Sequence, residues 1–217
     1  MMISARSTVS LCSRVGAAVA ALAAGAVIGA LAPLLDGFAG PAGHAAHLVL
    51  DAGWSWAALA FCVGLARRSR IESAVLAWLS LPAAVTAYYL TKLAQGAYVT
   101  VDLADPAGGT PHADWPGALS KIAVWCVAAC LFGPLCGLAG NLARNAGFRG
   151  LPFRVLVPLV AIAETTMRLR YEAALQAPAT GVTWSVIRLV AVGAIVLLAG
   201  CAVVARRSGV QAGPAPR

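Results

Sequence analysis

Residues 15–35 read VGAAVAALAAGAVIGALAPLL, a run that contains no charged side chain. An α-helix rises about 1.5 Å per residue, so about 20 apolar residues cross the roughly 30 Å hydrocarbon core of a bilayer. The run therefore predicts a first transmembrane helix. Because it is longer than the apolar part of a secretory signal peptide, we expect it to be retained in the protein.

The composition of the whole chain agrees with a membrane protein. Hydrophobic residues make up 60% of the 217 residues and charged residues 11%, and the mean hydropathy is +0.82. Ordinary soluble proteins carry roughly 25% charged residues, and a soluble globule of this size is too small to bury so much apolar surface. The composition excludes a soluble enzyme and a nucleic-acid-binding protein, although the formal net charge is +8.

Five further apolar runs follow the first one. They are Leu48–Ala66, Ser73–Lys92, Leu119–Leu142, Pro152–Leu175 and Trp184–Ala205. We predict an all-α fold, an integral membrane bundle of six transmembrane helices over residues 1–205, followed by a disordered basic cytoplasmic tail over residues 206–217. The run at 152–175 is the most polar of the six. Within the long connection at 94–117, residues 99–103 are expected to form a short surface or re-entrant strand.

The positions of the basic residues predict the orientation of the bundle. Eleven of the 16 Lys and Arg residues fall at the termini or in the second-to-third and fourth-to-fifth connections, namely Arg6, Arg14, Arg67, Arg68, Arg70, Arg144, Arg149, Arg154, Arg206, Arg207 and Arg217. The opposite connections carry Asp36, Asp102, Asp105 and Asp114. Because cytoplasmic loops are enriched in Lys and Arg, both termini are predicted to lie inside the cell.

Glu164 is the most informative polar residue, since it falls near the predicted midplane of the fifth span. A lone carboxylate at that depth costs at least a few kcal/mol, so it must be protonated, paired or exposed to water. Arg168 and Glu172 follow at spacings of four residues and share its helix face. Two interpretations stay open: a carboxylate that binds a solute or a proton in an outward-facing pocket, and a structural Glu–Arg ladder.

Other polar residues are expected at similar depth in the outer half of the bundle. The predicted binding residues are Glu164, Arg168, Asp51, Tyr88, Tyr89 and Arg188. Lys92 and Lys121 lie close enough to the surface to extend their ammonium groups into water. A cluster that carries both signs of charge suits a small polar or zwitterionic molecule better than a hydrocarbon.

A metal-dependent membrane enzyme is a further candidate class. His44, His47 and Asp51 lie at i, i+3 and i+7, so one helix face could present all three to zinc. The sequence lacks the His-Glu-x-x-His, Gly-x-Ser-x-Gly and phosphate-binding Gly-x-x-x-x-Gly-Lys motifs. We therefore expect no enzymatic activity, no metal and no cofactor.

Gly25 and Gly29 form a Gly-x-x-x-Gly pair in the first span. Small residues at this spacing let two helices approach closely. The pair predicts either a docking face for another membrane subunit or internal packing within the chain.

Short segments of the chain resemble a known family. They are Trp54, Ala57–Phe61, Gly64, Arg67–Arg68, Ala87–Leu90 and Phe132–Gly140. Together they resemble a family of small integral membrane proteins from high-GC actinobacteria that is catalogued as a domain of unknown function. The resemblance implies a six-helix membrane protein and no established activity. In architecture alone, the chain is also similar to the substrate-binding subunits of energy-coupling-factor vitamin transporters.

The sequence thus predicts a multi-pass protein of the cell membrane. The leading hypothesis is a non-enzymatic protein that binds or transports a small polar solute through an outward-facing pocket. The alternative is a structural or assembly protein that docks partner subunits through small-residue helix faces. The expected partners are the lipid bilayer and other membrane subunits, and no nucleic acid is expected.

Overall fold

The computed structural model describes residues 3–38, 40–101, 111–172 and 178–211. Its elements in chain order are α1 (Ile3–Asp36), α2 (Pro41–Asp51), α3 (Gly53–Leu65), α4 (Arg70–Ala94), β1 (Val99–Thr100), β2 (His112–Ala113), α5 (Trp115–Leu142), the 3-10 turn η1 (Gly147–Arg149), α6 (Leu151–Arg154), α7 (Leu156–Tyr171) and α8 (Pro178–Gln211). The predicted all-α class is confirmed. The two strands form only a short antiparallel ladder, in which Val99 pairs with Ala113.

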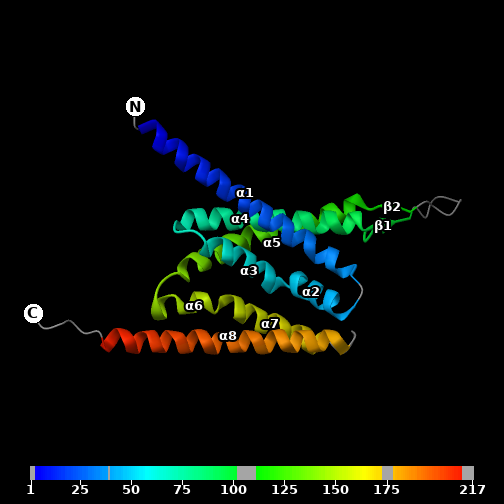
Figure 1. The fold of residues 1–217 in the computed structure, drawn as a ribbon. Helices are drawn as coiled ribbons and strands as arrows, with labels where there is room; N and C mark the ends of the chain where they lie inside the picture. Colours follow the sequence, from blue (N-terminus) through cyan, green and yellow to red (C-terminus); the bar gives the residue numbers. More distant parts are fainter. Residues whose placement is uncertain (1–2, 39, 102–110, 173–177, 212–217) are drawn as a thin grey trace, which may run out of the picture.

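The long helices lie side by side and run back and forth between two ends of the molecule (Figure 1). One end holds the start of α1, the end of α8, and the α3–α4 and α5–α6 connections, which include Arg67 and Arg149. The other end holds the α1–α2 connection and the β1–β2 ladder. The strand expected near residue 99 is therefore present, while Asp102 and Asp105 lie outside the described residues.

The described residues contain four helices long and apolar enough to cross a membrane, at Arg14–Asp36, Arg70–Ala94, Trp115–Leu142 and Pro178–Arg206. The pair α2 and α3, which is bent by 62°, makes a fifth if the pair counts as one broken span. The prediction of six transmembrane helices is therefore wrong. At 16 residues α7 reaches only about 24 Å, short of a roughly 30 Å hydrocarbon core, and it carries Glu164, Arg168 and Arg170.

Two other predicted boundaries differ from the structure. The second apolar run begins as a helix at Pro41 rather than at Leu48, and it is interrupted at Ala52, whose backbone is extended (φ −69°, ψ 140°). The last helix continues to Gln211, past the predicted start of the tail at residue 206. Residues 212–217 lie outside the described part of the chain.

Glycine contacts hold α1 against α4. A methyl group at Gly25 would overlap the backbone carbonyl of Ser80, and one at Gly29 would overlap that of Ala84. The Gly-x-x-x-Gly pair therefore packs within the chain. The alternative that this pair docks a partner subunit is wrong, because α4 already covers the glycines.

Glycines also bring α3, α4 and α5 together. Gly64 and Gly140 each abut a backbone carbonyl across the α3–α5 interface, and Gly137 abuts the backbone of Ser73 on α4. The Asn141 side chain donates to the Arg67 carbonyl at 2.7 Å and to the Ser73 hydroxyl at 3.1 Å. Close backbone approach and buried hydrogen bonds thus replace the large apolar core of a soluble protein.

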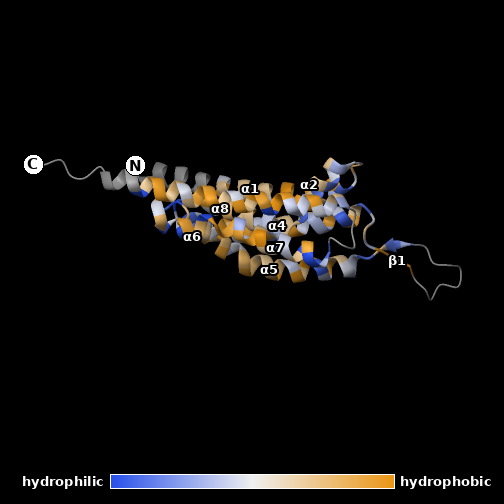
Figure 2. Cartoon of the chain, turned by 90° about the horizontal axis from the view of Figure 1, so that it is seen from below, coloured by the Kyte–Doolittle hydropathy of each residue, from blue (hydrophilic) through white to orange (hydrophobic). Residues whose placement is uncertain are grey.

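The long helices are hydrophobic over much of their length (Figure 2), and many of their large apolar side chains are exposed. The most exposed large side chains of α8 include Leu189, Val196 and Leu197, which are 66–70% exposed. In water such a surface would drive aggregation, whereas lipid tails solvate it. Such exposed apolar faces suggest contact with a lipid bilayer.

Candidate functional site

The break between α2 and α3 is the structural centre of the candidate site. An extended residue at Ala52 ends one helix and starts another, and each end leaves backbone groups without helical partners. Two of the carbonyls near the end of α2 accept side-chain hydrogen bonds. The Ser55 hydroxyl donates to the Val49 carbonyl, and the Trp56 indole N–H donates to the Leu50 carbonyl at 3.0 Å.

Glu164 of α7 caps the start of α3. Its Oε1 accepts from the backbone N–H of Gly53 at 3.0 Å, and its Oε2 accepts from that of Trp54 at 2.9 Å. Both carboxylate oxygens thus point at the positive end of the α3 helix dipole. The charge of Glu164 is placed where two unpaired donors would otherwise face an apolar environment.

Arg168 completes this arrangement from the same helix. Its Nε donates to Glu164 Oε1 at 3.0 Å, and its Nη1 donates to Glu172 Oε2 at 3.2 Å. The side chains of Glu164 and Arg168 are only 20% and 25% exposed. The guanidinium also lies 4.8 Å from the ring centre of Trp184, which is buried. The predicted Glu–Arg ladder is confirmed, with Arg168 shared between two carboxylates.

A second carboxylate, Asp51, lies on the other side of the break. It is the last residue of α2, and its Oδ1 accepts from the Tyr88 hydroxyl of α4 at 2.5 Å. The Tyr88 ring makes edge contacts with Trp56 at 5.7 Å and with Tyr89 at 5.1 Å, measured between ring centres. The ammonium group of Lys92 lies 4.8 Å from the centre of the same ring.

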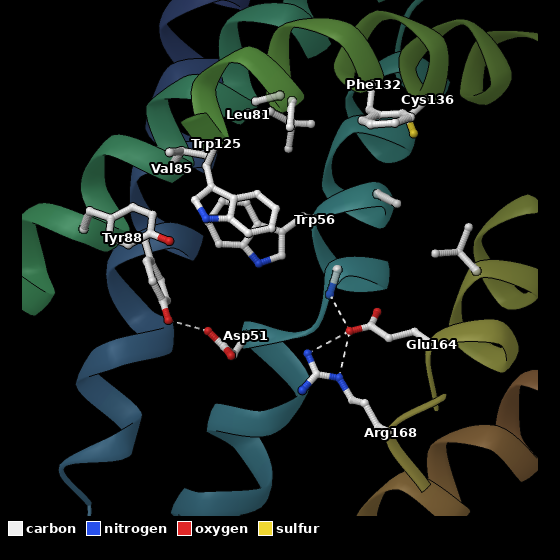
Figure 3. A pocket seen from close by; sticks show the side chains of 16 residues that line it. Asp51, Trp56, Leu81, Val85, Tyr88, Trp125, Phe132, Cys136, Glu164 and Arg168 are labelled. Carbon is white, nitrogen blue, oxygen red and sulfur yellow. Dashed lines mark hydrogen bonds and ion pairs between the residues drawn. The ribbon is translucent and has the colours of Figure 1, made fainter. Parts of the chain in front are cut away.

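A cavity of about 630 Å³ joins the two carboxylates. Its walls come from the end of α2, from α3, from the middle of α4 and α5, and from α7 (Figure 3). The lining residues are Asp51, Gly53, Trp56, Ala57, Leu81, Val85, Tyr88, Tyr89, Trp125, Ala128, Ala129, Phe132, Cys136, Val160, Glu164 and Arg168. Most of them are apolar or aromatic. The polar groups lie together in one region of the wall.

The structure brings most of the predicted binding residues together. Five of the six line this cavity, namely Asp51, Tyr88, Tyr89, Glu164 and Arg168. Arg188 is not among the lining residues, because it lies on α8, which contributes nothing to the wall. The position of a residue along its helix predicted its level in the bundle. It did not predict whether the side chain faces the cavity.

The three residues proposed as zinc ligands have separate partners. His44 Nε2 lies 3.1 Å from the Thr180 hydroxyl, and His47 Nδ1 donates to the Ala32 carbonyl at 2.8 Å. Asp51 is directed into the cavity (Figure 3). No group of three or more His, Cys, Asp or Glu side chains that could hold a metal ion occurs among the described residues.

Sequence reasoning missed the aromatic walls and the helix break. Trp56 and Trp125 project into the cavity from α3 and α5 (Figure 3), and Phe132 lies farther along α5. These Trp and Phe residues were only a weak sign of a cavity wall in the sequence, because Trp and Phe are also common on lipid-facing surfaces. The sequence Asp51-Ala52-Gly53, with a charge followed by glycine inside an apolar run, was the available sign of the break.

The groups that line this cavity can recognise a ligand noncovalently. Aromatic faces attract cations and apolar groups, and the polar region offers carboxylate acceptors, tyrosine hydroxyls and one guanidinium. Glu164 and Arg168 already satisfy each other and the start of α3. Asp51 has a less complete set of partners.

Comparison with known proteins gives no relative from which a role could be transferred. No protein-family model matches the chain, and no curated protein or solved structure matches it. The site must therefore be interpreted from its own geometry.

Proposed function

We propose that this multi-pass membrane protein binds a small amphiphilic molecule, without chemical conversion, in the cavity between α3, α4, α5 and α7. The observation that carries the proposal is the cavity itself, with aromatic walls and polar groups gathered in one region. Its volume of about 630 Å³ lies within the roughly 300–1,000 Å³ typical of small-molecule sites. The predominance of apolar walls favours an amphiphile over the fully polar solute expected from the sequence.

The lipid phase is the proposed route of entry. Trp125 and Phe132 line the cavity and are also 52% and 62% exposed, so the same side chains face outward between α5 and α7. Helix α5 packs on α3 and α4, whereas α7 packs mainly on α8 and α3. The side between α5 and α7 is thus the place where an apolar chain dissolved in the bilayer reaches the cavity.

We further propose that both termini face the cytoplasm of a cell whose plasma membrane holds the protein. The start of α1 and the end of α8 lie at the same end of the molecule as Arg67 and Arg149 (Figure 1). The segment formed by α6 and α7 returns the chain to the opposite end beside α3 and α8. The polar pair Glu164 and Arg168 is turned toward α3 and the cavity, which lowers the cost of placing charge at this depth.

Photolabelling with a diazirine derivative of dodecanol tests the binding proposal. In purified protein, we expect labels on the inner walls at Trp56 and Tyr88 in addition to the lipid-facing side of α8. The variant Ala128→Phe adds bulk to the cavity wall and should suppress labelling of Trp56 and Tyr88 without changing labelling of α8. The matched control Val127→Phe places the same ring on a 62% exposed position of α5 and should change neither.

Labels confined to the outer surface in the unmodified protein would contradict the proposal. So would equal inner-wall labelling in both variants, because a molecule held in the cavity must compete with the added ring.

A further inference from the structure

The cavity contains an unbalanced negative charge. Glu164 and Glu172 share Arg168, so two of the carboxylates at the α7 end are already paired with a cation. Asp51 forms no ion pair within the described part of the chain, and its hydrogen-bond donor, the Tyr88 hydroxyl, is neutral. Asp51 is therefore the lining carboxylate that has no cation partner among the described residues, although the group of Glu164, Arg168 and Glu172 also keeps one negative charge in excess.

The helix dipoles strengthen this difference. Asp51 is the last residue of α2, where the carbonyl groups create a negative potential. The positive potential at the start of α3 lies beside it but is already matched by Glu164. A cation at Asp51 interacts favourably with both the carboxylate and the end of α2.

Aromatic rings surround the same position. Tyr88 makes edge contacts with Trp56 and with Tyr89, and the three rings bring electron-rich faces to this part of the cavity wall. Such faces attract ammonium groups, and quaternary ammonium ions in particular. Lys92 already places its ammonium group over the Tyr88 ring, and its long side chain can extend toward the membrane surface when another cation approaches.

We propose that the polar end of the ligand is a primary or quaternary ammonium group bound at Asp51, with its apolar chain extending past Trp125 and Phe132. This assignment rests on the proposed binding function and specifies its ligand class. The ammonium group pairs with the Asp51 carboxylate and contacts the Trp56 and Tyr89 rings. The apolar chain follows the wall toward the side between α5 and α7.

Competition against the dodecanol photolabel tests the assignment in neutral maltoside micelles. The competitors share one chain and differ in their head groups: dodecyltrimethylammonium, dodecanol and dodecanoate. For the unmodified protein, we expect the cation to suppress labelling of Trp56 and Tyr88 at about one tenth of the concentration that dodecanol needs, since a carboxylate and aromatic faces act together on it. Dodecanoate should be the weakest competitor.

The variant Asp51→Asn should abolish the advantage of the cation and leave labelling by the alcohol intact. The control Asp36→Asn removes a carboxylate from the same end of the bundle but outside the cavity, and it should preserve the advantage. A lack of cation preference in the unmodified protein would overturn the assignment, even if Asp51→Asn failed to fold. Failure of the alcohol to label the inner walls would instead contradict the binding function.

The ammonium group could belong to a free amine or to a lipid head group. Lipid discs made of phosphatidylethanolamine or of a galactolipid distinguish these sources, because both lipids are uncharged overall and only the first carries an ammonium group. Weaker competition by dodecyltrimethylammonium in the phosphatidylethanolamine discs identifies the lipid head group, and equal competition identifies the free amine. Preference for dodecanoate in either disc would contradict both.

Discussion

Glu164 and Asp51 lie on either side of the same helix break and line the same cavity, yet their surroundings differ. Glu164 accepts two backbone N–H groups and pairs with Arg168, so each of its oxygens has a strong donor. Asp51 accepts one tyrosine hydroxyl at the negative end of a helix. The contrast teaches that depth in the membrane does not assign a role to a carboxylate. The number and charge of its donors separate a structural group from one available to a ligand.

The largest effect is expected from removing the Glu164 carboxylate. Glu164→Ala leaves the Gly53 and Trp54 N–H groups unpaired and Arg168 without its nearer partner. Breaking such a buried pair lowers the free energy of unfolding by about 2–4 kcal/mol. Thermal unfolding in micelles would measure the loss. A change as small as that of a surface substitution would show that the break at Ala52 does not depend on this cap.

Removing the partner charge should have an intermediate effect. Arg168→Met leaves the Glu164 cap in place but unneutralised, and we expect a loss of about 1–3 kcal/mol in stability. The double variant Glu164→Gln with Arg168→Met removes both charges and should recover part of that loss. A double-mutant cycle needs the single variant Glu164→Gln beside Arg168→Met. If the stability losses of these two variants simply add in the double variant, the pair is not coupled.

Removing Glu172, the outer carboxylate of the ladder, should have a small effect on stability. Glu172 has a side chain that is 43% exposed, and within the described residues that side chain bonds only to Arg168, so Glu172→Gln should lower stability by about 0.5 kcal/mol or less. Raising the salt concentration should reduce this small difference further. A loss of stability as large as that of Glu164→Ala would contradict this prediction, because the main stabilising charge would then lie at Glu172 rather than at Glu164.

The smallest effect on stability is expected at Asp51. Asp51→Asn keeps an oxygen that accepts from Tyr88, and it removes a charge that pairs with no cation in the described part of the chain. Stability should change by less than the roughly 0.5 kcal/mol expected for Glu172→Gln, or increase slightly. Thermal unfolding without any ligand would measure this. A large loss would show that Asp51 is structural, as Glu164 is.

Parts of the fold could be predicted because their causes are local. Uncharged runs such as residues 15–35 predict membrane-spanning helices from length and hydropathy alone, and four such helices are present. The spacing of Glu164, Arg168 and Glu172 predicted the ladder, because residues four apart share a helix face. The fifth predicted span, at residues 152–175, failed because hydropathy cannot tell a polar helix that packs on its neighbours from one that spans lipid by itself.

The position of the helix break could not be predicted because its partners are distant. Gly53 and Glu164 are 111 residues apart, and neither residue signals the other along the chain. The same is true of Asp51 and Tyr88, and of the aromatic walls supplied by Trp56 and Trp125. The sequence left two interpretations of Glu164 open, a ligand-binding carboxylate and a structural ladder. Its distant donors favour the structural one, since they show that Glu164 holds α3 in place.

The sequence by itself determined that the long helices suit an apolar environment and that the basic residues gather on one side of the predicted bundle. The length and hydropathy of the apolar runs suit helices that could cross a membrane, and the basic residues cluster at the termini and two connections. Only the tertiary structure decided which polar groups share a cavity and which of them are already satisfied. The physical reason is that the energy of a buried charge depends on the donors within a few ångströms, and helix packing brings these from distant parts of the chain.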